Sequence, residues 1–182
     1  MLAKLSNTFH KLSAKTWLIL LAFAVEIFFF TQLAPKMQAQ MPAGPLDLKP
    51  FYTPSQAFAL IESYGPETRA AYRTFEMTAD IIHPIAYVLF YGLLMSVLLQ
   101  RAFPSTSALQ KFNVAPVISW CFDMIENICI ITMLTVFPSQ PTILAWIAGV
   151  STSLKWAFFA ATMIMILVSL VKAALNGFKK QA

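Results

Sequence analysis

Four apolar runs alternate with polar stretches along the chain, and each is long enough to cross a bilayer. A transmembrane helix needs about 20 predominantly apolar residues. The runs cover residues 17–34, 81–100, 114–137 and 142–171. This pattern predicts an all-α, polytopic membrane protein whose four transmembrane helices form an antiparallel bundle. We expect residues 1–182 to form a single membrane domain, with residues 35–79 as its external segment.

The first apolar run has the layout of a secretory signal, because several Lys residues precede it. It is longer than the apolar part of such signals, which have about 7–15 residues, and it contains Glu26. We therefore predict that it is retained as the first span. Pro35 should end its helix, since proline lacks the N–H that a helix interior requires.

A helix start signal lies within the predicted external segment. Thr53 is a suitable N-cap, Pro54 suits the first helical position and Gln56 completes a capping box. Gly65 is placed to stop this helix. These residues predict a short amphipathic helix from Pro54 to Tyr64 that lies near the outer surface rather than across the membrane.

The second span is predicted to carry a polar face from outside into the membrane. A helix restarts at Pro66 and continues into residues 81–100, where Pro84 should produce a kink. Steps of three and four residues place side chains on one helical face. The face predicted here contains Glu76, Asp80, His83, Tyr87 and Tyr91.

The third span contains three polar residues that share one helical face. Asp123, Glu126 and Asn127 stand at positions i, i+3 and i+4. An acid near the centre of a span costs roughly 2.5–3.5 kcal/mol, so such residues normally face a protein interior and have partners. We expect this face to meet the polar face of the second span.

Counting about 1.5 Å per residue from the outer ends of the spans gives depths that can be compared between helices. Asp123 and Lys155 both fall roughly 22 Å deep, which predicts an ion pair between them. Glu126 lies roughly 17 Å deep and Glu26 roughly 12 Å deep. These depths predict an outward-opening polar cleft that is closed below by the ion pair, with Trp156 on its wall.

The excess of buried acid leaves two interpretations of these charges. The charges either pin the four helices together, as polar contacts of about 0.6 kcal/mol each, or form a functional site. Glu26, Asp123 and Glu126 face one buried Lys155. The acids that Lys155 does not compensate therefore need a proton or another cation, which favours a site. For Glu126 that cation would come from a ligand or from the Arg residues predicted at the mouth, Arg69 and Arg73.

Composition and charge narrow the class of partner. The chain is 58% hydrophobic and 12% charged, which is outside the range of soluble domains. Its net charge of +5 comes from Lys and Arg residues that flank the apolar runs, so we expect no nucleic-acid partner. Cys121 and Cys129 are about 12 Å apart along one helix, too far for a disulfide. No pattern of Cys or His favours a metal or another cofactor.

The Lys and Arg residues are distributed unequally between the two sides of the predicted membrane. Eight lie on the side of the two termini, and four lie on the other side, which also carries several acids. Cytoplasmic loops carry the excess of Lys and Arg in membrane proteins. We therefore expect both termini to be cytoplasmic.

The predicted binding site combines the polar residues of all four spans with two residues at the mouth of the cleft. No catalytic residue is assigned. The site consists of Glu26, Arg69, Arg73, Asp80, His83, Tyr87, Asp123, Glu126, Asn127, Lys155 and Trp156. The ligand would be a small molecule, a lipid or a proton, and the partners would be membrane lipids and either another membrane protein or a second copy.

Three classes of function remain open from these residues. A binding or transport protein would use Glu126 or Glu26 as its titrating group. An enzyme acting on a lipid or isoprenoid would use Asp123 or Glu126 as general acid or base. A structural or assembly subunit of a membrane complex would use the charges for packing alone.

The spacing of these polar residues resembles that of a family of small, uncharacterised bacterial four-span membrane proteins. The resemblance covers residues 52–159 and rests on Tyr64-Gly65, Arg69, Tyr72, Asp80, His83-Pro84, Tyr87, Asp123, Glu126-Asn127 and Lys155-Trp156. It implies a four-helix layout with these residues as the shared polar set, and a location in the bacterial inner membrane. It brings no established activity.

Overall fold

The computed structural model of the chain describes residues 1–41 and 43–179, and this part contains no β-strand. Its α-helices are α1 (Leu2–Leu12), α2 (Thr16–Phe28), α3 (Ala34–Gln40), α4 (Pro54–Ser63), α5 (Pro66–Met77), α6 (Ala79–Ala102), α7 (Ala115–Val136) and α8 (Thr142–Lys179). A π-helical turn, Phe29–Leu33, joins α2 to α3, and short 3-10 helices cover Leu46–Leu48 and Ala108–Val114. The predicted all-α class is confirmed.

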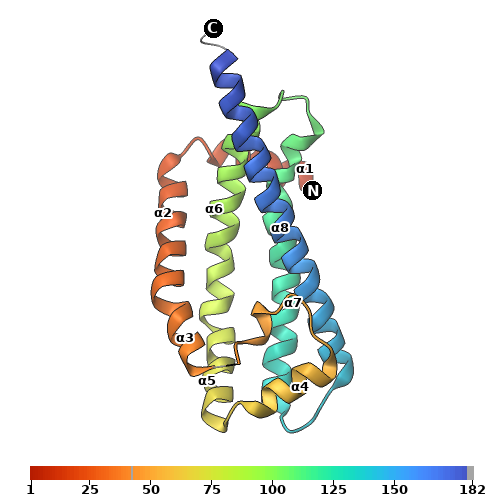
Figure 1. Cartoon of the computed structure of the whole chain (residues 1–182). Helices are drawn as coiled ribbons and strands as arrows, with labels where there is room; N and C mark the ends of the chain where they lie inside the picture. The colour runs from red at the N-terminus through yellow and green to blue at the C-terminus, as the bar shows by residue number, and fades with distance from the viewer. Residues whose placement is uncertain (42, 180–182) are drawn as a thin grey trace.

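Four stretches of the described chain are long and apolar enough to span a membrane. They are Thr16–Gln40, Pro66–Ala102, Ala108–Val136 and Thr142–Gly177. The long helices run side by side as a bundle, and both termini lie at the same end of it (Figure 1). The prediction of a polytopic four-helix membrane protein is therefore confirmed.

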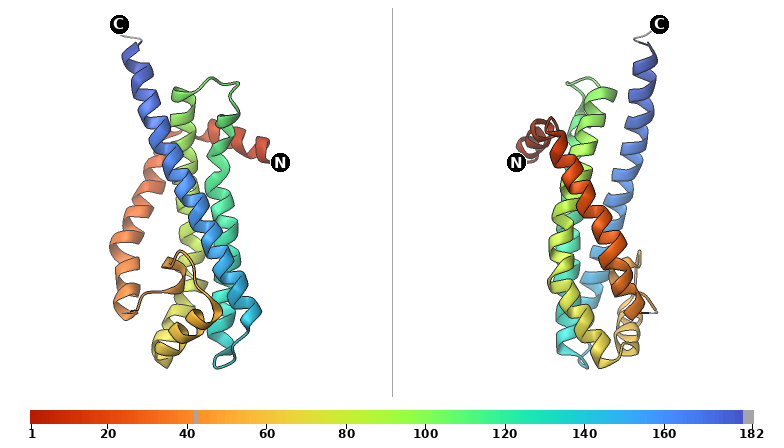
Figure 2. Two further views of the ribbon diagram at one scale, coloured as in Figure 1. Left: turned by 45° about the vertical axis from the view of Figure 1, so that its right-hand side comes forward. Right: turned by 90° about the vertical axis from the view of Figure 1, so that its left-hand side faces the viewer.

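The helices of the bundle are packed unevenly. α6, α7 and α8 pack closely together, whereas α2 packs mainly against α6 and stands at the edge (Figure 2). α1 lies across the end of the bundle where the termini are, and is held there by the Ser6 hydroxyl, which donates to the Gln110 carbonyl at 3.3 Å. The position of α2 leaves a space between α2 and α8 inside the bundle.

The predicted short helix is present as α4, and its capping box is confirmed. The Gln56 N–H donates to the Thr53 hydroxyl, and the Thr53 N–H donates to Gln56 Oε1 at 2.8 Å. α4 packs against α8 at the end opposite the termini (Figure 1). The Tyr64 hydroxyl after it donates to the Gly44 carbonyl at 2.6 Å, and burial raises the pKa of this phenol above its ordinary value.

One expectation about proline needs correction. Pro35 does not end the first helix, which continues to Gln40 as α3. The π-helical turn before Pro35 begins a new helical segment, and a proline at the start of a segment needs no N–H. Residues 35–40 are therefore helical rather than an irregular part of the external segment. In the second spanning stretch, the helix that begins at Pro66 is interrupted at Thr78, and Pro84 lies inside α6.

Candidate functional site

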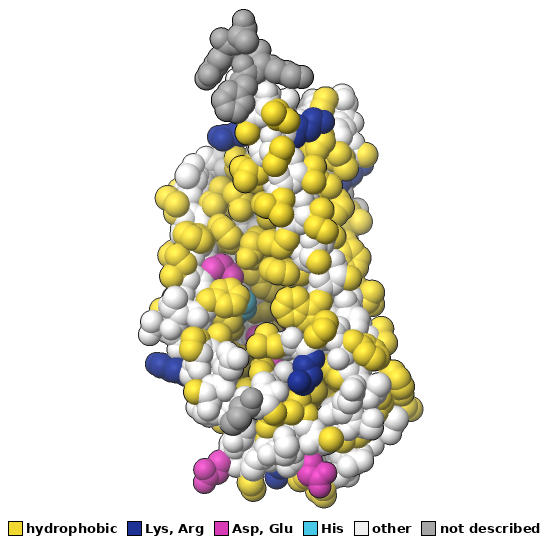
Figure 3. All heavy atoms as spheres, in the orientation of Figure 1, with side chains coloured by type: hydrophobic (Ala, Val, Ile, Leu, Met, Phe, Trp, Pro, Cys, Tyr) yellow, Lys and Arg dark blue, Asp and Glu magenta, His cyan; other side chains and the backbone are white. Residues whose placement is uncertain are grey.

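A cavity of about 520 Å³ lies between the first spanning stretch and α8. α6 and α7 form its back wall, and the segment containing Pro45, Asp47 and Leu48 also lines it. Figure 3 shows the hollow on the side of the bundle, with an acidic side chain and a histidine visible within an apolar surround. The opening is therefore lateral, whereas the sequence led us to expect a cleft open to the outside.

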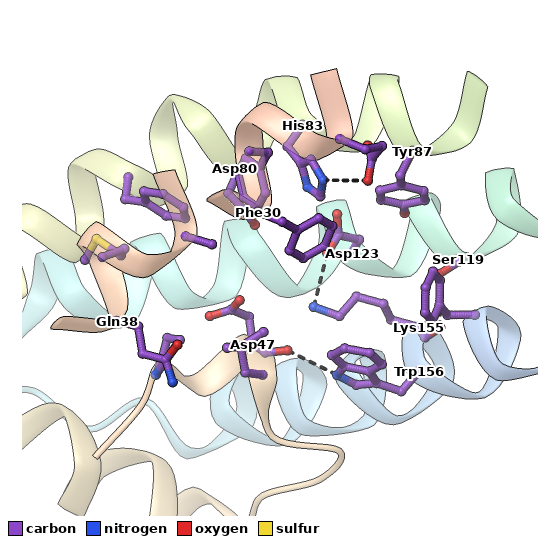
Figure 4. Close-up of a pocket in the computed structure, with 18 of the residues that line it drawn as sticks. Phe30, Gln38, Asp47, Asp80, His83, Tyr87, Ser119, Asp123, Lys155 and Trp156 are labelled. Atoms are coloured by element: carbon purple, nitrogen blue, oxygen red, sulfur yellow. Dashed lines mark hydrogen bonds and ion pairs between the residues drawn. The ribbon is translucent and has the colours of Figure 1, made fainter. Parts of the chain in front are cut away.

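The walls of the cavity are aromatic and its floor is polar. Phe29, Phe30, Phe75, Trp156 and Phe159 contribute rings to the walls. The polar side chains come from different elements and surround one space (Figure 4): Asp47 from the external segment, Asp80 and His83 from α6, Asp123 from α7 and Lys155 from α8. The cavity is therefore amphiphilic.

Lys155 forms ion pairs with two acids of α7. Its Nζ lies 3.1 Å from Asp123 Oδ1 and 2.5 Å from Glu126 Oε2. The predicted pair with Asp123 is confirmed. The two acids are three residues apart, so they lie on the helix face that meets α8. Glu126 is fully buried, and its other oxygen accepts a hydrogen bond from the Thr152 hydroxyl.

The pair with Glu126 corrects one expectation. We expected Lys155 to compensate a single acid and the cationic partner of Glu126 to come from a ligand, Arg69 or Arg73. The partner is Lys155 itself. A lysine side chain reaches both acids because one helical turn rises only about 5.4 Å.

Asn127 joins α7 to α6 through Asp80. Its side-chain amide donates to Asp80 Oδ2 at 2.8 Å and to the Asp80 carbonyl at 3.2 Å. The second bond follows from Pro84, four residues after Asp80: proline has no N–H to donate to that carbonyl. Asn127 thus supplies the donor that Pro84 removes, and the two polar faces predicted from the sequence do meet.

Glu26 and His83 connect α2 to α6. His83 Nε2 lies 3.3 Å from Glu26 Oε2, and Glu26 is buried. The imidazole also stacks on Phe29, with 3.6 Å between ring centroids. Tyr87, one turn further along α6, meets the imidazole edge to face. This cluster fixes the edge helix beside the cavity.

The two arginines predicted at the mouth of the cleft do not line the cavity. The Arg69 guanidinium donates to the carbonyls of Tyr64 and Ile61 and lies 3.9 Å above the Phe137 ring. The last carbonyls of a helix have no intrahelical donor, so they attract a nearby cation. Arg69 therefore caps the end of α4. Arg73, one turn later on α5, is half-buried.

The predicted site residues thus fall into three groups. Those that line the cavity are Glu26, Asp80, His83, Tyr87, Asp123, Lys155 and Trp156. Glu126 and Asn127 lie behind the cavity wall and hold Lys155 and Asp80. Arg69 and Arg73 stand apart from it.

Two further acids near the cavity were not among the predicted site residues. The carboxylate of Asp47 accepts a bond of 2.7 Å from the Tyr72 hydroxyl, and its backbone carbonyl accepts one of 3.1 Å from Trp156 Nε1. Glu76 is fully buried on α5. Its place four residues before Asp80 is a signal in the sequence, whereas Asp47 lies in a Pro- and Gly-containing linker with no periodicity.

Comparisons with protein-family models, with curated proteins and with solved structures find no match to this chain. The functional interpretation consequently depends on the residues around the cavity.

Proposed function

We propose that this membrane protein binds an amphiphilic small molecule or lipid in the cavity between α2 and α8. The supporting observation is a 520 Å³ cavity with aromatic walls and a charged floor inside the bundle. Pockets of about 300–1,000 Å³ with a few convergent polar groups are typical of small-molecule sites. The apolar part of the ligand would lie among Phe30, Trp156 and Phe159, with its polar group toward Asp123 and Lys155.

The position of the opening supports entry from the bilayer. It lies on the side of the bundle between two helices whose outer faces are rich in exposed apolar residues (Figure 3). Such faces lie against lipid in a membrane protein. An amphiphile dissolved in the membrane could reach the charged floor by sliding between α2 and α8 without crossing water.

The charges of the floor favour a ligand that donates hydrogen bonds. Lys155 is already paired with two acids, and Glu26 is paired with a histidine. Carboxylate oxygens accept hydrogen bonds and repel anions. A hydroxyl or amine would therefore be bound in preference to a carboxylate or phosphate.

Ligand extraction with a cavity-filling variant tests this function. Ala34 lines the cavity, whereas Ala24 on α2 is exposed and does not line it. We expect mass spectrometry to detect one compound in near-stoichiometric amount with the wild-type protein purified in mild detergent and with Ala24→Trp. Ala34→Trp should lose it. An equal yield of bound compound from both variants would refute the assignment to this cavity.

A membrane-embedded enzyme acting on a lipid or isoprenoid is the second candidate. The observation that favours it is the Glu26–His83 contact of 3.3 Å in the cavity wall, since a histidine oriented by a carboxylate can transfer a proton. Incubating the purified protein with its extracted compound separates the two candidates. An enzyme changes the mass of the compound and loses this activity in His83→Gln, while a binding protein returns the compound unchanged.

We also propose that the protein lies in a bacterial inner membrane with both termini cytoplasmic. The location of both termini at one end and the excess of Lys and Arg there support this orientation. Lys180, one of the counted residues, lies outside the described part of the chain. A C-terminal tag should be labelled only after permeabilisation of cells, and labelling of intact cells would reverse the orientation.

A further inference from the structure

Three carboxylates from separate parts of the chain meet beside the cavity. Asp47 comes from the external segment, Glu76 from α5 and Asp80 from the start of α6. One oxygen of each lies within 4.8 Å of the others. All three side chains are buried or nearly so, and the two that come from the helices are separated by the interruption at Thr78. Like charges so close repel one another, so something must compensate them.

Glu76 is the member of this group without any partner. Its side chain has no exposed surface, and neither carboxylate oxygen has a hydrogen-bond partner. The other two acids have one donor each: the Tyr72 hydroxyl for Asp47, and the Asn127 amide for Asp80. A buried carboxylate is normally paired or bound to a metal.

Within residues 1–41 and 43–179, no Lys, Arg or His forms an ion pair with any of these three acids. The ion pairs of Lys155 go to Asp123 and Glu126, and Arg69 is engaged by backbone carbonyls. His83 pairs with Glu26. The cations nearest to the centre of the bundle are therefore already occupied by other groups.

We propose that Asp47, Glu76 and Asp80 bind a divalent cation of the hard, oxygen-binding class, such as Ca²⁺, Mg²⁺ or Mn²⁺. Two ligand oxygens on opposite sides of Ca²⁺ are about 4.8 Å apart, which matches the spread of this group. A set of carboxylates without thiolate or imidazole suits these ions better than Zn²⁺. Asn127, which holds Asp80, has a buried Oδ1 without a partner and adds a further oxygen to the neighbourhood.

The cation would tie the external segment to the helices of the bundle. It would bridge Asp47 to the two sides of the interruption at Thr78 and thereby fix the external end of the cavity. Asp47 and Asp80 also line the cavity, whereas Glu76 lies outside it. A protein without an amphiphilic ligand would still bind the cation.

Thermal unfolding of the full chain in mild detergent tests the site. After treatment with a chelator, addition of CaCl₂, MgCl₂ or MnCl₂ should raise the melting temperature of the wild-type protein. At a concentration one hundred times the dissociation constant, the rise should be about 5–10 °C. Titration of Mn²⁺ followed by electron paramagnetic resonance should show one ion bound per chain, because the signal of free Mn²⁺ falls as it binds.

Glu76→Gln is the decisive variant, with Glu67→Gln as its matched control on the exposed surface of α5. Glu76→Gln should lose the shift and the bound Mn²⁺ while melting no lower than the chelated wild type, since it removes one of three repelling charges. Glu67→Gln should keep both the shift in melting temperature and the bound Mn²⁺. If Glu76→Gln fails to fold, Asp47→Asn in the external segment provides the same comparison. A wild-type protein that neither binds Mn²⁺ nor responds to the three cations, or a Glu76→Gln protein that responds fully, would overturn the proposal.

Discussion

Replacement of Lys155 by methionine tests the energetics of the buried ion pairs. Methionine fills a similar volume but leaves Asp123 and Glu126 without a cation. Both acids are buried, with side-chain exposures of 7% and 0%. Removing one partner of a single buried pair costs about 3–5 kcal/mol. Because Lys155 serves two acids, we expect Lys155→Met to lose stability in the upper part of this range.

The loss should be recovered when the acids are neutralised as well. In the triple variant with Asp123→Asn and Glu126→Gln no charge remains uncompensated, and such replacements are often close to neutral. We expect the triple variant to unfold within about 1 kcal/mol of wild type. Asp123→Asn combined with Lys155→Met should show a coupling energy of about 0.5–3 kcal/mol.

Unfolding in mixed micelles, followed by tryptophan fluorescence, measures these free energies. Trp156 is a suitable reporter, since the Lys155 amine lies 5.8 Å from the centre of its ring. Lys172→Met on the exposed end of α8 is the control, where the amine lies over the Phe103 ring at 4.2 Å and a loss of about 0.5–1 kcal/mol is expected. Equal losses for Lys155→Met and Lys172→Met, or a triple variant as unstable as Lys155→Met, would refute the reasoning.

Three further predictions concern contacts outside this cluster. Asn127→Ala should lower the free energy of unfolding by about 1–3 kcal/mol, because the carbonyl and carboxylate of Asp80 lose their donor. Adding Pro84→Ala should restore part of this stability, since it returns an N–H to the Asp80 carbonyl. Unfolding in mixed micelles would show whether the second change helps. Gly149→Ala should destabilise the fold by about 1–3 kcal/mol, since a Cβ there would overlap the Tyr52 carbonyl oxygen, and unchanged unfolding would contradict this contact. Burial raises the pKa of Tyr52, so its phenol loses a proton at lower pH in the unfolded chain than in the folded protein. Stability should therefore fall as the pH rises above about 10, and it should fall less steeply in Tyr52→Phe. Chemical denaturation across this pH range measures the difference.

Features that depend on local periodicity could be predicted from the sequence. The four spans follow from length and apolarity, and α4 follows from the capping pattern of Thr53, Pro54 and Gln56. The pair between Asp123 and Lys155 follows from depth alone, because both residues stand far from the ends of rigid helices. In each case the geometry of a regular helix determines the position.

Features that depend on irregular backbone could not be predicted in this way. Asp47 reaches the buried acids through a linker whose path has no period, so no count of residues gives its depth. Continuation of the first helix past Pro35 required a π-helical turn, which the sequence does not mark. Arg69 was expected at the mouth of the cleft, but the open carbonyls at the end of α4 lie within its reach and hold its guanidinium.

The polar contacts of the bundle account for packing and for a binding cavity together. Contacts made only for packing would draw α2 against α8 and fill the space between them. Instead, the contact between Glu26 and His83 holds α2 on α6, and the contacts of Lys155 hold α8 on α7, so neither contact draws α2 toward α8. The cavity lies between α2 and α8, and the charged side chains that line it from α2, α6, α7 and α8 already have partners. A preformed cavity reduces the entropy lost on binding, so the same contacts that stabilise the bundle also favour ligand binding.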